Sequence, residues 1–172
     1  MRIVVSDSSC LIDLRKASLL AALLGLPYEF LIPNTLFEDE LLSFAPEQKI
    51  ALLRAGLKVI DLPGKKVLRA REVVRSVPRL SVHDGFAFAL AETHAGCILL
   101  TGDGALRTFA TEHSVEVRGV LWVVDELYNH RLASAASLVA VLRGFSEDPS
   151  VRLPRRELGM YIKRYESRAG RP

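Results

Sequence analysis

The chain has 172 residues, of which 49% are hydrophobic and 25% are charged, and these are ordinary values for one globular domain rather than for a disordered or fibrous chain. No run of eighteen apolar residues occurs, and the chain enters a strand-like segment at once, so we expect neither a membrane span nor a signal peptide. Cys10 and Cys97 lie in or beside apolar runs, which predicts two reduced thiols in a cytoplasmic protein.

The net charge of +3 is too small to indicate a nucleic-acid partner by itself. The basic residues are concentrated near the C-terminus, because residues 152–172 contain seven Lys or Arg and two acids.

Five apolar segments predict β-strands, at residues 2–6, 28–32, 57–62, 97–101 and 115–118. Several of them are continuous apolar runs, which is typical of strands that are covered on both faces. Helical patterns lie between nearly all of them, so the sequence predicts an α/β fold with a mainly parallel sheet.

The sequence predicts helices between the strands, at residues 9–24, 35–43, 46–56, 65–77, 81–94 and 102–113. The helix at 81–94 is apolar nearly all round and should be buried. The helix at 65–77 carries five Lys or Arg, most simply as a solvated basic face. After residue 118 the alternation stops, and we expect two helices in 119–144 and a third in 155–168.

The last predicted helix combines an apolar stripe with basic residues. Leu158, Tyr161, Ile162 and Tyr165 follow helical spacing, so this helix should dock on the rest of the molecule. Basic side chains beside the stripe leave contact with RNA open. Residues 146–150 form a loop and a weak boundary.

Acidic residues recur where the predicted strands end. Asp7 ends the first strand and Asp103 follows the fourth, and the carboxyl ends of parallel strands lie at one edge of a sheet, where ligands bind. Asp84 opens the predicted helix at 81–94, and that helix can start at the same edge. The helix at 35–43 adds three more acids, Glu38, Asp39 and Glu40.

Each acid also has a structural explanation. Asp7 and Asp103 are suited to be helix N-caps, and Ser81 with Asp84 has the spacing of a capping box. As a cluster, however, four carboxylates repel one another unless a cation neutralises them. Carboxylate oxygens without a Cys or His cluster favour Mg²⁺ or Mn²⁺ over zinc. The chemistry that fits is metal-assisted hydrolysis of a phosphodiester.

Other functional motifs are missing from the sequence, which has no P-loop, no dinucleotide fingerprint and no nucleophile elbow. The four histidines have no ligand spacing, and His83 is expected to be exposed at a helix start. Trp122 lies in an apolar segment and is expected in the core.

Four segments together resemble the PIN-domain family of nucleases, which includes the VapC-type toxins of prokaryotic toxin–antitoxin systems. The segments are residues 5–12 (VSDSSCLI), 32–41 (IPNTLFEDEL), 80–91 (LSVHDGFAFALA) and 99–106 (LLTGDGAL). The resemblance covers roughly residues 1–125. It implies a three-layer α/β/α fold with a central five-stranded sheet and a metal-dependent ribonuclease site.

The resemblance also implies roles for particular residues. The acidic quartet that would hold Mg²⁺ or Mn²⁺ and act in catalysis is Asp7, Glu40, Asp84 and Asp103. Ser8 or Ser9 and Thr101 would support it through their hydroxyl groups. The second acid is open among Glu38, Asp39 and Glu40, and we select Glu40 because it directly precedes an aliphatic residue, Leu41.

The chain continues beyond the resemblance, so we predict a PIN-like domain at 1–125 and a helical extension at 126–172 packed on it. The resemblance implies an RNA substrate, a small antitoxin partner and a homodimer. A catalytically weak module that binds RNA or protein is the alternative. A metal-dependent phosphatase is the weakest hypothesis, because Ser9 stands where a D-x-D motif would have its second aspartate.

Overall fold

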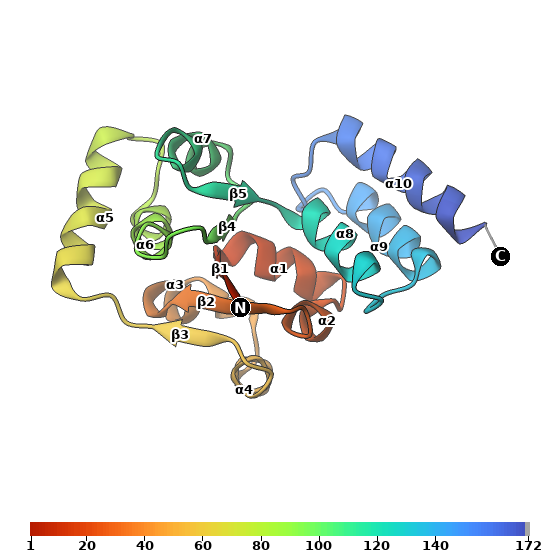
Figure 1. Ribbon diagram of the computed structural model, residues 1–172, viewed down its shortest axis with the longest axis horizontal. Helices are drawn as coiled ribbons and strands as arrows, with labels where there is room; N and C mark the ends of the chain where they lie inside the picture. The colour runs from red at the N-terminus through yellow and green to blue at the C-terminus, as the bar shows by residue number, and fades with distance from the viewer. Residues whose placement is uncertain (171–172) are drawn as a thin grey trace.

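The computed structural model of the protein describes residues 1–170 and is organised around a five-stranded sheet (Figure 1). The strands are β1 (Arg2–Ser6), β2 (Tyr28–Pro33), β3 (Lys58–Ile60), β4 (Ile98–Leu100) and β5 (Glu116–Arg118). Their order is β3-β2-β1-β4-β5, and every neighbouring pair is parallel. The predicted α/β class and the five-stranded parallel sheet are therefore confirmed.

The helices cover both faces of the sheet. In chain order they are α1 (Ser8–Lys16), α2 (Leu20–Leu24), α3 (Asn34–Asp39), the 3₁₀ turn η1 (Leu41–Ser43), α4 (Pro46–Arg54), α5 (Gly64–Ser76), α6 (Val82–Ala91), α7 (Gly104–Glu112), α8 (Val120–Asn129), α9 (Ala135–Glu147) and α10 (Arg155–Ala169). Figure 1 shows α5, α6 and α7 on one side of the sheet and α1, α2 and α8 on the other. This is the three-layer α/β/α arrangement.

Two predicted helices are each divided in the structure. The helix expected at 9–24 is interrupted because Ser18 adopts a left-handed φ of 57°, which ends α1. The backbone N–H of Leu19 then donates to the Leu14 carbonyl oxygen at 2.8 Å, and α2 begins at Leu20. The helix expected at 35–43 ends at Asp39, and a 3₁₀ turn follows.

Helix α6 is buried between the sheet and α5, as its apolar sequence predicts. Its Ala87 and Phe88 side chains are inaccessible to solvent. Helix α5 crosses α6 so closely that a Cβ on Gly85 would lie 2.7 Å from the carbonyl oxygen of Ala70. Glycine at this position is therefore required by the distance between the two helices.

We expect Gly85→Ala to lower the free energy of unfolding by about 1–3 kcal/mol, because the added methyl group forces two packed helices apart. Gly144→Ala is the matched control, since a Cβ there meets nothing within 4 Å in the interior of α9. That control should stabilise the protein by about 0.5–1 kcal/mol through helix propensity. Urea unfolding of both variants tests the prediction, and an equal effect of the two would contradict it.

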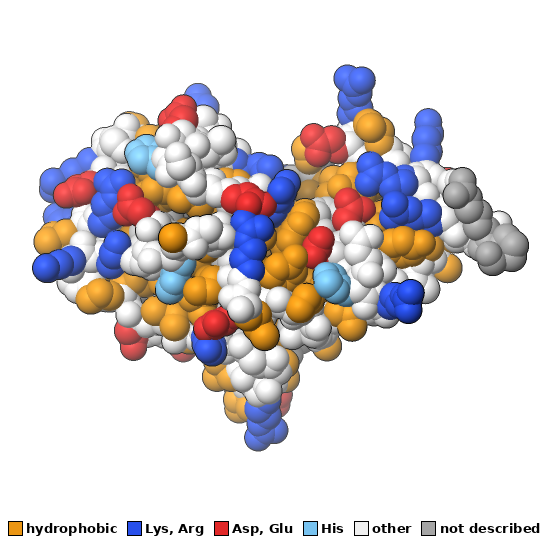
Figure 2. Space-filling model, in the orientation of Figure 1, with side chains coloured by type: hydrophobic (Ala, Val, Ile, Leu, Met, Phe, Trp, Pro, Cys, Tyr) orange, Lys and Arg blue, Asp and Glu red, His pale blue; other side chains and the backbone are white. Residues whose placement is uncertain are grey.

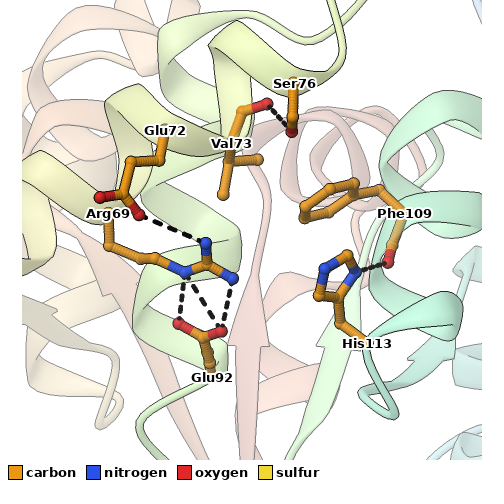
Figure 3. A network of polar contacts seen from close by, with 7 residues as sticks. All are labelled: Arg69, Glu72, Val73, Ser76, Glu92, Phe109 and His113. Carbon is orange, nitrogen blue, oxygen red and sulfur yellow. Dashed lines mark hydrogen bonds and ion pairs between the residues drawn. The ribbon is translucent and has the colours of Figure 1, made fainter.

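An ion-pair network also fastens α5 to α6 (Figure 3). Arg69 donates from Nη2 to Glu92 Oε1 at 2.8 Å and from Nη1 to Glu72 Oε2 at 3.4 Å. Its guanidinium lies 5.7 Å from the centre of the Phe88 ring. The predicted basic face of 65–77 is thus partly neutralised, although Arg71 and Arg75 remain exposed. Figure 2 shows Lys and Arg side chains over α5 and again over α10.

The C-terminal helices join the same hydrophobic core as the sheet. Helix α10 lies along α9 (Figure 1), and its Leu158 and Tyr165 side chains are buried while Tyr161 and Ile162 are partly buried, as the apolar stripe predicts. The proposed boundary at residue 125 falls inside α8, and the division of the chain there remains a prediction. Residues 171 and 172, which end the basic segment, lie outside the described residues.

Two tyrosines, the buried Tyr165 and the partly buried Tyr161, tie α10 to α8 through one carboxylate. Asp125 accepts a hydrogen bond from the Tyr165 hydroxyl at 2.7 Å and another from the Tyr161 hydroxyl at 2.8 Å. Burial and the neighbouring Asp125 carboxylate raise the pKa of both phenols, so each remains a hydrogen-bond donor at neutral pH.

Two further predictions from the sequence concern the cysteines and a membrane span. Cys10 and Cys97 are both buried and free, as expected. No helix within residues 1–170 has the length and hydrophobicity that crossing a membrane requires.

Candidate active site

Asp7 lies where β1 ends and α1 begins, at the carboxyl edge of the sheet. Its backbone N–H donates to the Leu100 carbonyl oxygen at 2.9 Å, which fixes the residue beside β4. Although Asp7 occupies the N-cap position of α1, its side chain makes no cap hydrogen bond. Asp7 is therefore the N-cap residue of α1 by position, as one of its two interpretations predicts, but its carboxylate is held by other groups.

Hydroxyl groups hold the Asp7 carboxylate. Its Oδ2 accepts hydrogen bonds from Ser9 Oγ at 2.8 Å and from Thr101 Oγ1 at 2.9 Å, and Ser8 Oγ lies 3.3 Å from its Oδ1. All three residues predicted to support the acid therefore contact it. The Asp7 residue is 4% exposed.

Burial raises the pKa of the Asp7 carboxyl above its ordinary value. Hydrogen bonds from Ser9 and Thr101 lower the pKa, and the nearby charge of Glu40 raises it again. The net shift is upward, so the ionised carboxylate is disfavoured until an opposite charge approaches it.

Glu40 is the member of the second acidic segment that the structure places beside Asp7. Ser8 Oγ donates a hydrogen bond to Glu40 Oε2 while also contacting Asp7, so one hydroxyl links the two carboxylates. Glu38 instead faces Lys49, with 3.6 Å between Oε2 and Nζ. Asp39 is mostly exposed and contacts His83.

His83 lies closer to the acids than its expected exposed position. Its Nε2 is 3.2 Å from Asp39 Oδ2 and its Nδ1 is 3.5 Å from Glu40 Oε1, and its side chain is 28% exposed. Sequence reasoning missed this contact because it joins the end of α3 to the start of α6. The only signal was that His83 directly precedes Asp84.

Asp84 lies in the first turn of α6, where it takes part in the capping box and also belongs to the acidic cluster. Its Oδ2 accepts a hydrogen bond from the Ser81 backbone at 2.7 Å, and its own N–H donates to Ser81 Oγ at 3.1 Å, which completes the predicted capping box. Burial raises the pKa of Asp84, and the charges of Asp7 and Asp103 raise it further. Asp84 therefore lies within electrostatic range of both other aspartates.

Asp103 caps α7, as one of its two interpretations predicts. Its Oδ1 accepts a hydrogen bond from the Leu106 N–H at 2.7 Å, and the residue is exposed. Thr101 connects it to Asp7, because Thr101 Oγ1 accepts the Asp103 N–H at 3.1 Å while donating to Asp7. A second tie runs from the Gly102 N–H to Ser9 Oγ at 3.3 Å. The β1–α1 and β4–α7 turns are thus joined.

The donor set suits a hard cation in its chemistry, because every candidate ligand is a carboxylate oxygen. As the side chains stand within residues 1–170, no three His, Cys, Asp or Glu residues are grouped closely enough to hold a metal ion together. Asp84 and Asp103 each direct one oxygen to a helix N-terminus. A cation that uses one or two carboxylates and keeps several waters, as Mg²⁺ does, fits this arrangement.

Two of three comparisons with known proteins find a match to this chain. A family model described as DUF3368, a PIN domain, matches residues 3–167 and so includes α8, α9 and most of α10. A search of curated proteins found no match to the chain.

A solved PilT N-terminus domain protein from the hyperthermophilic archaeon Sulfolobus solfataricus P2 has a similar fold, with a TM-score of 0.52 and 18% sequence identity. The alignment covers 73% of this chain and 93% of that one. At this identity the likeness concerns the fold alone, whereas the family match extends over nearly the whole sequence. The chain belongs to the PIN-domain family.

Proposed function

We propose that the protein is a metal-dependent endoribonuclease that hydrolyses RNA phosphodiesters at the cluster of Asp7, Glu40, Asp84 and Asp103. PIN domains are typically nucleases that use divalent metals, and the family match supports this chemistry. The observation that carries the proposal is the buried Asp7 carboxylate, which hydroxyl groups orient and which no basic side chain within the described residues neutralises. Within residues 1–170, no Lys or Arg forms an ion pair with any of the four acids.

The chain's own residues have distinct parts in this proposal. Asp7 and Glu40 present carboxylates that Ser8 holds together, and Thr101 with Ser9 fixes the orientation of Asp7. Asp84 and Asp103 complete the acidic edge from the starts of α6 and α7. The chemistry that Mg²⁺ or Mn²⁺ supplies at such a site is activation of a water and stabilisation of the leaving oxygen.

We also propose that the protein is the toxin of a toxin–antitoxin pair, that a small antitoxin protein binds it, and that it forms a homodimer. The resemblance of the four acidic segments to VapC-type toxins supports this role. We expect expression of the protein alone to stop cell growth, and we expect the Asp7→Asn variant to be harmless at the same protein level. Growth curves with matched immunoblots check this. Equal toxicity of the two proteins would contradict a role that depends on cleavage.

A catalytically weak module that binds RNA or protein is the second candidate function. It is favoured by the involvement of Asp84 and Asp103 in helix caps, and by the separation of the acids. Such a module would bind RNA equally well with and without divalent metal.

Metal binding separates the two candidates. We expect calorimetry to detect saturable Mn²⁺ binding by the wild-type protein, and Asp7→Asn to weaken it at least about tenfold, which corresponds to about 1.4 kcal/mol. RNA cleavage should occur with Mn²⁺ or Mg²⁺ and stop when EDTA removes the metal. If the wild type and Asp7→Asn bind Mn²⁺ equally, and still do so when the titration is repeated with a short RNA present, the result would favour the binding module.

A further inference from the structure

A cavity of about 690 Å³ lies beside the acidic cluster, between the PIN-like core and the C-terminal extension. The turn at 101–104 and the start of α8 form its wall on the core side, and residues 152–154 with Tyr161 form the opposite wall. Its volume lies within the range of roughly 300–1,000 Å³ that small-ligand sites occupy. Both parts of the chain are therefore needed to form it.

Three arginines line this cavity: Arg107, Arg118 and Arg152. Arg118 is paired with Glu116, with 2.9 Å between Nη2 and Oε1. Arg107 and Arg152 form no ion pair within residues 1–170, so their charges are available to a ligand.

Two acids, Asp13 and Glu157, also line the cavity. The charge of Asp13 is partly offset by Lys16, whose Nζ lies 4.0 Å from its Oδ1. The lining thus contains three arginines and two acids, and the charges that an anionic ligand can meet are those of Arg107 and Arg152, with which no acid within residues 1–170 pairs.

Two aromatic side chains add flat surfaces to the lining. Trp122 packs against the core, with its ring centre 5.5 Å from that of Tyr28, but it is only half-buried. The predicted core position is therefore only partly correct. Tyr161 is held in place by its hydrogen bond to Asp125 and by the Arg164 guanidinium, which lies 4.5 Å from the centre of its ring. Arginine with aromatic rings is the combination by which proteins bind single-stranded nucleic acids, through phosphates and base faces respectively.

The cavity shares residues with the acidic edge. The Thr101 hydroxyl donates to Asp7, while its carbonyl oxygen accepts a hydrogen bond from Arg107 Nη1 at 3.2 Å. Gly102 and Gly104, which flank Asp103, also line the cavity and carry no side chain to block a passing strand. Thr101 and Gly102 therefore connect the cavity wall directly to the turn that carries Asp103.

We propose that this cavity binds one nucleotide of a single-stranded RNA, next to the phosphate that lies at the acidic cluster. Arg107 and Arg152 contact the phosphate of that nucleotide, and the Trp122 ring contacts its base, with the Tyr161 side chain on the opposite wall. The C-terminal extension thus supplies half of a substrate subsite. This inference rests on the proposed function for the identity of the strand, and on the cavity lining for its location.

The test measures binding without turnover, in the Asp7→Asn background. Trp122 is the only tryptophan of the chain, so its fluorescence reports directly on the cavity. We expect a single-stranded RNA of about ten nucleotides to quench this fluorescence in a saturable manner. Arg107→Ala and Arg152→Ala should each weaken binding about fivefold or more.

Arg71→Ala is the matched control, because it removes the same charge from an exposed position on α5, at the opposite end of the molecule from α10 (Figure 1). It should leave the affinity unchanged. A second readout separates phosphate binding from general folding effects. The plot of log binding constant against log salt concentration should become shallower by about 0.7 for each arginine–phosphate interaction that a substitution removes, in the cavity variants only.

The results distinguish this inference from the proposed nuclease. Unchanged affinity, salt dependence and Trp122 fluorescence in the cavity variants would overturn the nucleotide site, even if the wild-type protein cleaves RNA. Quenching and weakened binding in those variants would support the site, even if no cleavage is found with any metal. With Asp7 intact, Arg107→Ala and Arg152→Ala should raise the KM for RNA cleavage with little change in kcat.

Discussion

Asp7→Asn is expected to lower the rate of RNA cleavage by at least about 100-fold, because changes even to residues that only orient metal ligands cost roughly 10–100-fold. The substitution keeps the shape of the side chain. The amide oxygen can still accept the hydrogen bonds from Ser9 and Thr101, so the β1–α1 turn should be unchanged. Initial rates on a fluorescent RNA in Mn²⁺ measure the effect.

Glu112→Gln is the matched control for this loss, since Glu112 is exposed at the C-terminal end of α7, away from the acidic edge where that helix starts. It should retain full activity. Full cleavage by Asp7→Asn would show that the buried carboxylate is not part of the reaction centre.

Asp7→Asn should also make the metal-free protein more stable at neutral pH. The pKa of Asp7 is raised in the folded state, chiefly by burial, so the folded protein loses stability as the pH rises from about 3.8 through that raised value. Asparagine does not ionise and avoids this loss. In EDTA, the melting temperature of Asp7→Asn should therefore exceed that of the wild type at neutral pH, and the difference should disappear in acid.

Tyr165→Ala is expected to lower the free energy of unfolding by about 3–5 kcal/mol, because a large aromatic side chain is removed from a fully buried position. The loss includes the hydrogen bond to Asp125, which connects α10 to α8. Tyr165→Phe keeps the ring and removes only that bond, at a cost of about 1–3 kcal/mol. Urea unfolding followed by circular dichroism measures both.

Met160→Ala is the control for this series, because Met160 lies on the same helix and is 56% exposed. Its effect should stay within about 0.5 kcal/mol. We expect one cooperative transition in all variants, since α10 shares its core with the sheet. An equally small effect of Tyr165→Ala, or an early separate transition of α10, would show that the extension folds independently.

The sequence predicts those features of the fold that depend on local pattern. The five apolar segments define the parallel sheet, and the positions of Asp7 and Asp103 after strands place them at one edge. The break at Ser18 was not predictable, because serine carries no preference for the left-handed conformation that ends α1.

Contacts between distant segments were harder to predict than the elements themselves. Local spacing alone leaves Glu38, Asp39 and Glu40 open, and Glu40 is selected only through the aliphatic residue that follows it; the hydrogen bond from Ser8 gives a structural reason for that choice. The same limit applies to the cavity, whose walls come from segments up to 148 residues apart, from Asp13 to Tyr161. No local spacing brings such residues together.

The central position of β1 has a consequence for how the chain folds. Val4 pairs with Phe30 of β2 on one side and with Ile98 of β4 on the other. Because β1 precedes both partners, its apolar segment and the Asp7 turn stay incompletely enclosed until the chain has been synthesised through β4. Contacts of such long sequence separation slow folding and prolong the exposure of strand edges. During synthesis, the acidic cluster therefore assembles only after β4 and the start of α7 have joined β1, and a shorter nascent chain has no complete site.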